Sequence, residues 1–348
     1  MKMRKYGLYG VVLLFIAFLF IYPLDAYVSK PGGAYELSPI VEVENGDEDD
    51  VGAFSLMTIA IGKATPFSYV AATFSDKMKI LPVHKVRREG ENDEEYNVRQ
   101  KKLMSDSHFN AITTAFKKVG IPVEIKYDGV FVMSVLPGGA AEGKLKSGDK
   151  IREVDGVHLH EVGQFANLIS SKEKGDHLTV LVERDDELNE VELTVGEIPN
   201  SEGRIGLGVQ FQEDRELKTE PAVTIHTADI GGPSAGLMFT LEIMNQLMEE
   251  DLTKGYNIAG TGEMLADGTV GRIGGADFKV IAADREDVEI FFAPDDDLPQ
   301  NVRELNPGIM TNYEEAVKTA KKIGTKMKIV PVKTIDDALA YLESLEPK

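Results

Sequence analysis

Residues 231–236, which read Gly-Gly-Pro-Ser-Ala-Gly, restrict the fold of this chain more than any other segment. Residues 222–226 before them alternate as a half-buried strand does, and residues 237–248 after them favour a helix. The sequence therefore predicts a strand, a tight turn and a helix that begins close to Ser234. Backbone N–H groups at a helix start lack helical partners, so they can stabilise the oxyanion of an acyl-transfer intermediate. The alternative is that Ser234 is only an N-cap residue.

Two further glycine-rich motifs follow in order. Residues 260–264 read Gly-Thr-Gly-Glu-Met, and residues 271–283 contain a Gly-Gly pair with Lys279 four residues after its second glycine. Thr261 precedes Lys279 by eighteen residues, and Ser234 precedes it by forty-five. In this order and at these spacings, the three motifs resemble the proteolytic domain of the Lon protease family.

The resemblance implies a catalytic dyad in which Ser234 is the nucleophile and Lys279 the general base, with Thr261 orienting the lysine. One position departs from the family pattern. Most members carry an acidic residue three positions before the serine, whereas this chain has Gly231 there and its nearest acid is Asp229.

A serine–lysine dyad also follows from the chemistry of the two side chains. A serine hydroxyl is a weak nucleophile that needs an adjacent base. Lysine becomes such a base when burial lowers its pKa from about 10.4. The apolar neighbours Phe278 and Val280 favour that burial, and the alternative is a lysine exposed on an ordinary helix. The absence of cysteine excludes a cysteine protease, disulfides and thiolate zinc sites.

A second resemblance lies in the middle of the chain. Residues 129–141 read as a strand that ends in Pro-Gly-Gly-Ala-Ala, and residues 148–156 contain Gly-Asp-Lys-Ile and Val-Asp-Gly. These motifs resemble a PDZ domain, which implies binding of an extended peptide at a sheet edge. Residues 138–144 also fit the spacing of a nucleotide-binding P-loop, but Leu145 stands where a serine or threonine must hold magnesium. We therefore expect no nucleotide and no other cofactor.

Three other segments do not have a single structural interpretation from the sequence. Residues 206–209, Gly-Leu-Gly-Val, fit either the carboxylate-binding loop of a PDZ domain or the first strand of the protease domain, and we prefer the second interpretation. His158, His160 and Glu161 lack the spacing of a zinc protease, so we expect a hairpin surface and no metal site. Residues 94–119 predict one or two helices without evident chemistry.

The N-terminus predicts a membrane segment. Lys2, Arg4 and Lys5 precede residues 7–24, a run of eighteen residues without a charge. No small-x-small cleavage site follows, and tyrosines flank the run, so we prefer an uncleaved transmembrane anchor to a signal peptide. The positive charges place the N-terminus in the cytoplasm and the catalytic part outside.

Together these patterns predict an α+β protein whose parts are an anchor (1–35), a mixed strand and helix region that can belong to the protease domain (36–126), a PDZ domain (127–197) and a Lon-type proteolytic domain (203–348). The predicted function is a membrane-anchored, ATP-independent serine endopeptidase that cleaves peptides or proteins positioned by the PDZ domain. The alternatives are a PDZ adaptor on a decayed protease fold and a soluble subunit of an ATP-dependent protease. The net charge of −20 argues against nucleic acid as a partner, and a homo-oligomer stays open.

Overall fold

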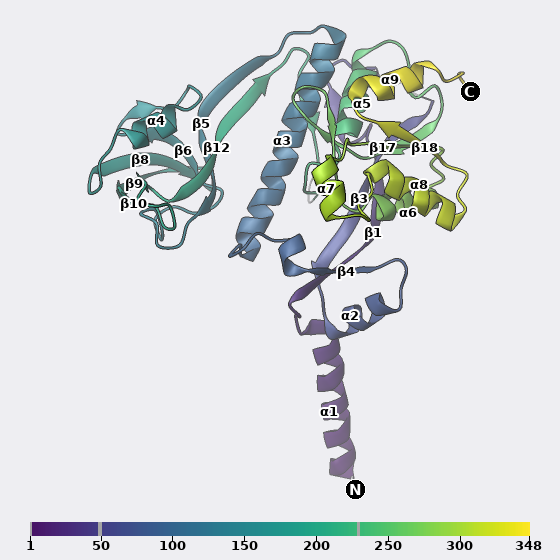
Figure 1. Ribbon diagram of the computed structural model, residues 1–348, viewed down its shortest axis with the longest axis horizontal. Helices are drawn as coiled ribbons and strands as arrows, with labels where there is room; N and C mark the ends of the chain where they lie inside the picture. Colours follow the sequence, from purple (N-terminus) through teal and green to yellow (C-terminus); the bar gives the residue numbers. More distant parts are fainter. Residues whose placement is uncertain (1, 48–50, 228–229) are drawn as a thin grey trace.

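The computed structural model describes residues 2–47, 51–227 and 230–348. Asp229, the acid nearest to Ser234 in the sequence, lies outside these ranges. Figure 1 shows two bodies on either side of a long helix, α3 (Asp93–Val119), with helix α1 (Lys2–Ile21) projecting away from them. α1 contacts the rest of the protein through α2 (Pro66–Thr73), where Phe20 stacks on Phe67 at 4.5 Å between ring centroids.

The predicted transmembrane anchor finds no support in this structure. Over the described part of the chain, no helix combines the length and the apolar character that crossing a membrane requires.

The larger body is built on a six-stranded sheet. The strand order is β18-β17-β14-β3-β1-β4, with bounds Lys328–Val332, Ile290–Pro294, Asn257–Gly260, Ala53–Lys63, Ala26–Glu36 and Lys79–Pro82. β3, β14, β17 and β18 run parallel to one another, whereas β1 is antiparallel to β3 and to β4. The early strands β1 and β3 therefore share a sheet with strands more than 190 residues later in the chain.

Helices cover both faces of this sheet. α3, α5 (Gly236–Leu247) and α9 (Ile335–Glu343) pack on one face around Phe54, Leu237 and Phe292. α6 (Ala276–Arg285) and α8 (Asn312–Ile323) pack on the other face around Met57 and Phe291. Neighbouring residues of one strand thus enter different cores, as the alternation of side chains in a strand requires. The short helix α7 (Gln300–Leu305) and two small ribbons, β2 (Val41–Val43) with β13 (Val223–Ile225) and β15 (Glu263–Met264) with β16 (Val270–Gly271), complete this body.

α3 is one continuous helix, although the sequence left one or two helices open. Asn92 begins it with a capping box, in which its side chain accepts a hydrogen bond from the backbone N–H of Glu95. Gly120 ends it in the left-handed conformation, with φ of 80°. Its buried face enters the same core as α5.

The smaller body is a sheet of order β12-β5-β6-β8-β9, with bounds Val209–Lys218, Glu124–Val135, Lys150–Val154, His177–Arg184 and Glu187–Thr194. It has its own core, whose buried residues run from Val130 to Leu207. The short helix α4 (Gln164–Ser170) contributes Phe165 to this core, and β7 (Val157–His158), β10 (Gly196–Glu197) and β11 (Ile205–Gly206) lie beside it. β5 and β12 form two long arms that reach back to α3 (Figure 1).

Residues 206–209 lie in the smaller body, where Gly206 belongs to a separate two-stranded ribbon and Val209 begins β12. Gly206 of β11 pairs with Gly196, and Val209 of β12 pairs with Val135 of β5. This pairing differs from our preferred interpretation of the segment as the first strand of the protease domain, because β12 pairs with β5 from Val209 to Lys218, with two irregularities in register.

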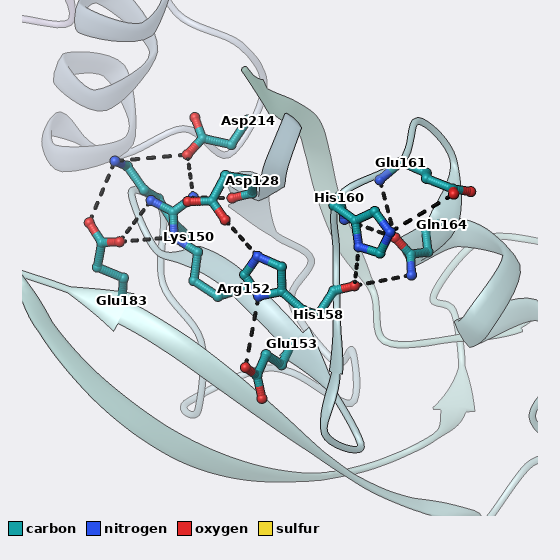
Figure 2. A network of polar contacts seen from close by, with 10 residues as sticks. All are labelled: Asp128, Lys150, Arg152, Glu153, His158, His160, Glu161, Gln164, Glu183 and Asp214. Carbon is teal, nitrogen blue, oxygen red and sulfur yellow. Dashed lines mark hydrogen bonds and ion pairs between the residues drawn. The ribbon is translucent and has the colours of Figure 1, made fainter. Parts of the chain in front are cut away.

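A buried arginine organises one side of the smaller sheet (Figure 2). Arg152 is 7% exposed, and its guanidinium contacts Glu183 at 2.7 Å and Asp214 at 2.9 Å. The hydrogen bond from Arg152 lowers the pKa of Glu183. His158 lies beside this cluster on the hairpin and contacts Asp128 at 3.0 Å. Across the described residues, no group of three histidine or carboxylate side chains is placed to hold a metal ion.

Candidate active site

The three residues predicted for the site come together where strand β14 ends. Thr261 directly follows Gly260, the last residue of β14. Ser234 precedes α5 on one face of the sheet, and Lys279 lies in α6 on the other. The two helices therefore present the serine and the lysine to each other past the end of the strand, where no backbone separates them.

Ser234 does not cap helix α5. The N-cap position belongs to Ala235, and no side-chain capping bond is made there. The turn before it contains Gly232 with φ of 89°, a left-handed conformation that glycine adopts without strain. The hydroxyl of Ser234 is therefore free to face the lysine.

Lys279 is 3% exposed, and its chain neighbours Phe278 and Val280 are also buried. Burial lowers its pKa from 10.5 to about 7, because the apolar surroundings disfavour the charged amine. Among the described residues, no carboxylate lies within ion-pair distance to restore that charge. A large fraction of Lys279 is therefore neutral near neutral pH.

The polar atoms of the three side chains form a directed chain of hydrogen bonds. Lys279 Nζ lies 2.7 Å from Ser234 Oγ and 2.8 Å from Thr261 Oγ1. Thr261 Oγ1 donates its own proton to the carbonyl oxygen of Ser234 at 3.0 Å. Because that proton is already used, Thr261 accepts an N–H from the lysine. The lone pair of a neutral Lys279 is then left for the hydroxyl proton of Ser234.

The loop that carries Ser234 is held from several sides. The backbone N–H of Gly262 donates to the carbonyl of Ser234 at 2.9 Å, and the N–H of Leu237 donates to the carbonyl of Gly262 at 3.0 Å. Helix α3 adds two contacts, from the Gln100 carbonyl to the N–H of Gly232 at 3.1 Å and from Ser107 Oγ to the carbonyl of Pro233 at 3.2 Å. Sequence reasoning missed both α3 contacts, since residues 94–119 carry no motif.

The backbone N–H groups of Ser234 and Ala235 at this loop have no partner within the described ranges, as is also true of Gly231. Both adjoin the serine hydroxyl and the start of α5. An oxyanion that forms on a carbonyl attacked by Ser234 can accept hydrogen bonds from them.

A cavity of about 830 Å³ opens onto the dyad. Its lining includes the stretch of β3 from Leu56 to Ile61 and, from α3, Tyr96, Gln100 and Met104. Among the described residues that line it, the charged side chains are Arg272 and Lys279. Arg272 is itself paired with Asp296 at 3.0 Å.

Glu263, which follows the Thr-Gly pair, makes no hydrogen bond or ion pair with Lys279 among the described contacts. It lies in β15, and burial followed by the nearby charge of Asp106 raises its pKa. This position makes Glu263 part of the support for the loop rather than of the dyad.

Comparisons with known proteins agree with the two bodies seen here. Residues 118–195 match the family model of the PDZ domain, and residues 206–343 match that of the Lon protease (S16) C-terminal proteolytic domain. A Lon protease of Ureaplasma parvum serovar 3 is 29% identical over 129 residues, which are 37% of this chain and 16% of that protein. The chain thus spans about a sixth of the length of this relative.

Two of the solved structures that match each cover about a quarter of this chain. The PDZ domain of an SdrC-like protein from Listeria monocytogenes is 32% identical and covers 24% of this chain and 88% of that one, with a TM-score of 0.23. A protein from Geobacillus thermodenitrificans is 38% identical and covers 24% of this chain and 95% of that one, with a TM-score of 0.22. The family models, not these scores, carry the comparison: residues 118–195 are similar to a PDZ domain, and residues 206–343 are similar to the C-terminal proteolytic domain of the Lon protease (S16) family.

Proposed function

We propose that this protein is an ATP-independent serine endopeptidase in which Ser234 is the nucleophile and Lys279 the general base. The observation that carries the proposal is the 2.7 Å contact between Lys279 Nζ and Ser234 Oγ, made by a lysine whose pKa burial lowers to about 7. The match of residues 206–343 to a proteolytic domain supports the same reaction class.

In the proposed reaction, neutral Lys279 takes the hydroxyl proton as Ser234 Oγ attacks the scissile carbonyl carbon. The carbonyl oxygen becomes an oxyanion near the N–H groups of Ser234 and Ala235. When the tetrahedral intermediate collapses, the C–N bond breaks and the Lys279 ammonium gives its proton to the leaving amine. Neutral Lys279 then deprotonates a water, which hydrolyses the ester and restores the serine.

Thr261 acts in this scheme as a positioning residue. It holds Lys279 Nζ at 2.8 Å and directs its own proton to the Ser234 carbonyl. It therefore fixes the lysine without competing for the lone pair that accepts the serine proton.

Independence from ATP is proposed for this chain because its only P-loop-like spacing, at residues 138–144, carries Leu145 at the magnesium-holding position. Those residues form turns in the PDZ domain rather than a loop that opens a helix. We propose that the PDZ domain binds the substrate chain and raises its concentration near the dyad.

The proposal is tested with the full chain acting on fluorescein-labelled unfolded casein. We expect Ser234→Ala to lower the rate by about a thousandfold or more while the circular dichroism spectrum stays unchanged. Ser171→Ala, at an exposed serine of the PDZ domain, is the matched control and keeps full activity. Casein cleavage by the Ser234→Ala protein at the wild-type rate would contradict the assignment of Ser234 as the nucleophile. Casein binding without cleavage by the wild type would favour the PDZ adaptor instead.

The extracytoplasmic location is a proposal from residues 1–24 alone, where positive charges precede an apolar run. A phosphatase reporter fused after Lys348 is expected to be active only if that end lies outside the cytoplasm. An inactive reporter on a stable, full-length fusion would place the catalytic part inside.

A further inference from the structure

The short helix α2 turns its most apolar side toward solvent. Phe67, Val70 and Phe74 recur at the spacing of one helix face, and their side chains are 51%, 57% and 86% exposed. Residues 64–75, which contain the helix, carry no charge. The opposite side of α2 packs against the protein, where Ala72 enters a small buried core. Contiguous apolar side chains exposed in this way mark an interaction surface.

This apolar face of α2 continues onto helix α1. Phe20 of α1 stacks on Phe67, and Figure 1 shows α1 leaving the protein beside α2. Every residue from Val11 to Phe15 of α1 is more than 45% exposed. Consecutive residues of a helix point in directions about 100° apart, so these apolar side chains surround α1 on all sides.

A lipid surface accounts for this distribution, whereas a protein partner does not. A protein docked on α1 covers one side of the helix, but acyl chains cover every side. Tyr22, which follows α1, and Tyr69 of α2 are both exposed, and tyrosine favours the boundary between acyl chains and water. The net charge of −20 gives no general attraction to anionic headgroups, so apolar contact must supply the affinity.

We propose that the face of α2 formed by Phe67, Val70 and Phe74 inserts into the surface of a lipid bilayer beside α1. Helices of this kind lie in the plane of the interface, with the apolar face buried about 5–10 Å deep. The inference goes beyond the proposed function, because it gives the larger body a lipid contact of its own. Since α2 shares its core with Ala26 and Val28 of β1, this contact also restrains the orientation of the six-stranded sheet over the lipid.

The chain has no cysteine, so labelling of single introduced cysteines tests the contact directly. The full chain with Val70→Cys is reconstituted into phosphatidylcholine vesicles and treated with a charged maleimide that does not enter lipid. Leu188→Cys is the matched control, because Leu188 lies in β9, is 62% exposed and follows α1 on the same side. We expect Val70→Cys to react at least about tenfold more slowly than Leu188→Cys, each relative to its rate in urea, since withdrawing the apolar face from lipid costs more than about 1.4 kcal/mol.

A second substitution tests the apolar character of the face. Phe74→Asp, made in the chain with Val70→Cys, adds a charge at the most exposed of the three positions, where little packing is lost. A charge opposes insertion into lipid, so we expect labelling of Val70→Cys to become at least about tenfold faster. Phe74→Leu keeps an apolar side chain and should leave the slow labelling unchanged. Circular dichroism checks that both variants fold.

Equal labelling rates for Val70→Cys and Leu188→Cys in vesicles would overturn the inference. Slow labelling that is lost when the protein is diluted into more lipid would show that a second copy covers the face, and would overturn it too. The same holds if Phe74→Asp leaves the slow labelling unchanged.

Val12→Cys, in the apolar run of α1, separates this inference from the proposed membrane location. Slow labelling at Val12→Cys with fast labelling at Val70→Cys overturns the contact of α2 and keeps α1 in lipid. Fast labelling at both positions overturns both proposals. The readout is exposure of a side chain, so none of these results depends on whether the protein cleaves peptides.

Discussion

At the scale of single residues, the properties of the site follow from burial of one amine. Lys279 is 3% exposed, and its pKa is lowered to about 7. Only the neutral amine accepts the serine proton, so we expect kcat/KM to rise with pH and level off above a midpoint near 7. The measurement is hydrolysis of a short quenched peptide between about pH 5.5 and pH 9. A profile that is flat across this range would contradict the role of Lys279 as base.

The same burial links Lys279 to folding stability. Its folded pKa of about 7 lies below the unfolded value of 10.5, so the unfolded state binds more protons between these values. Stability contributed by this group therefore rises with pH across that window and is constant below it. In Lys279→Met the contribution is gone, and we expect the variant to be inactive yet at least about 1 kcal/mol more stable at neutral pH. Urea unfolding at pH 7 and pH 10 measures the difference in stability between Lys279→Met and the wild type. If that difference does not become smaller at pH 10, the prediction is wrong.

Thr261 allows a test of positioning. Thr261→Val keeps the shape but removes the acceptor for Lys279 Nζ and the donor to the Ser234 carbonyl. We expect kcat to fall about 10- to 100-fold with KM nearly unchanged, because the lost contacts orient the base. Thr261→Ser keeps the hydroxyl and should retain most of the activity. An equal loss of kcat in Thr261→Val and Thr261→Ser would show that packing, not the hydroxyl group, matters at this position.

At the scale of elements, the site depends on how closely helix α5 approaches the ribbon of β15. A side chain on Gly236, the first residue of α5, would place its Cβ 2.6 Å from the backbone nitrogen of Met264. Gly274 has open space at the corresponding point. We expect Gly236→Ala to lower the free energy of unfolding by about 1 to 3 kcal/mol, and Gly274→Ala to change it by less than about 0.5 kcal/mol. Similar midpoints for both variants in thermal unfolding would rule out the close approach.

The sequence predicted some elements of the site well and others not at all. Ser234, Thr261 and Lys279 could be found because each stands in a glycine-rich motif, and the structure brings the three side chains together. The β3 lining of the cavity and the two α3 contacts could not be found. Strand alternation and helical periodicity indicate which face of an element is buried, but not which distant segment packs against it. The contact between Ser107 and Pro233, for example, joins residues that are 126 positions apart in the chain.

At the scale of the whole molecule, the PDZ domain is an insertion whose two ends lie side by side. Tyr127 of β5 pairs with Arg215 of β12, and Arg215 also contacts Asp106 and Phe109 of α3. The residues of the separate PDZ core all lie between Val130 and Phe211. Residues 128–214 can therefore be replaced by an Asn-Gly turn, which suits a two-residue hairpin, without opening the core around α3.

We expect this shortened protein to hydrolyse a short quenched peptide with kcat/KM within about twofold of the full chain, because the dyad and its supports remain. Cleavage of unfolded casein should fall about fivefold or more, since a tethered substrate loses its effective concentration. Thermal unfolding serves as the control for folding. Unchanged casein cleavage by a folded variant would leave the PDZ domain without a recruiting role.

The pairing of β3 with β14 has a consequence for the synthesis and folding of this protein. β14 is made about 200 residues after β3, which at roughly 5–20 residues per second is a delay of about ten seconds or more. In that interval the insertion can fold on its own and bring its ends together, which shortens the loop that the sheet must later close. Lys279 lies in α6, which follows β14 in the chain, so a nascent chain shorter than 279 residues lacks one member of the proposed dyad. Before that point, a growing chain lacks the pair of side chains that we propose for peptide cleavage.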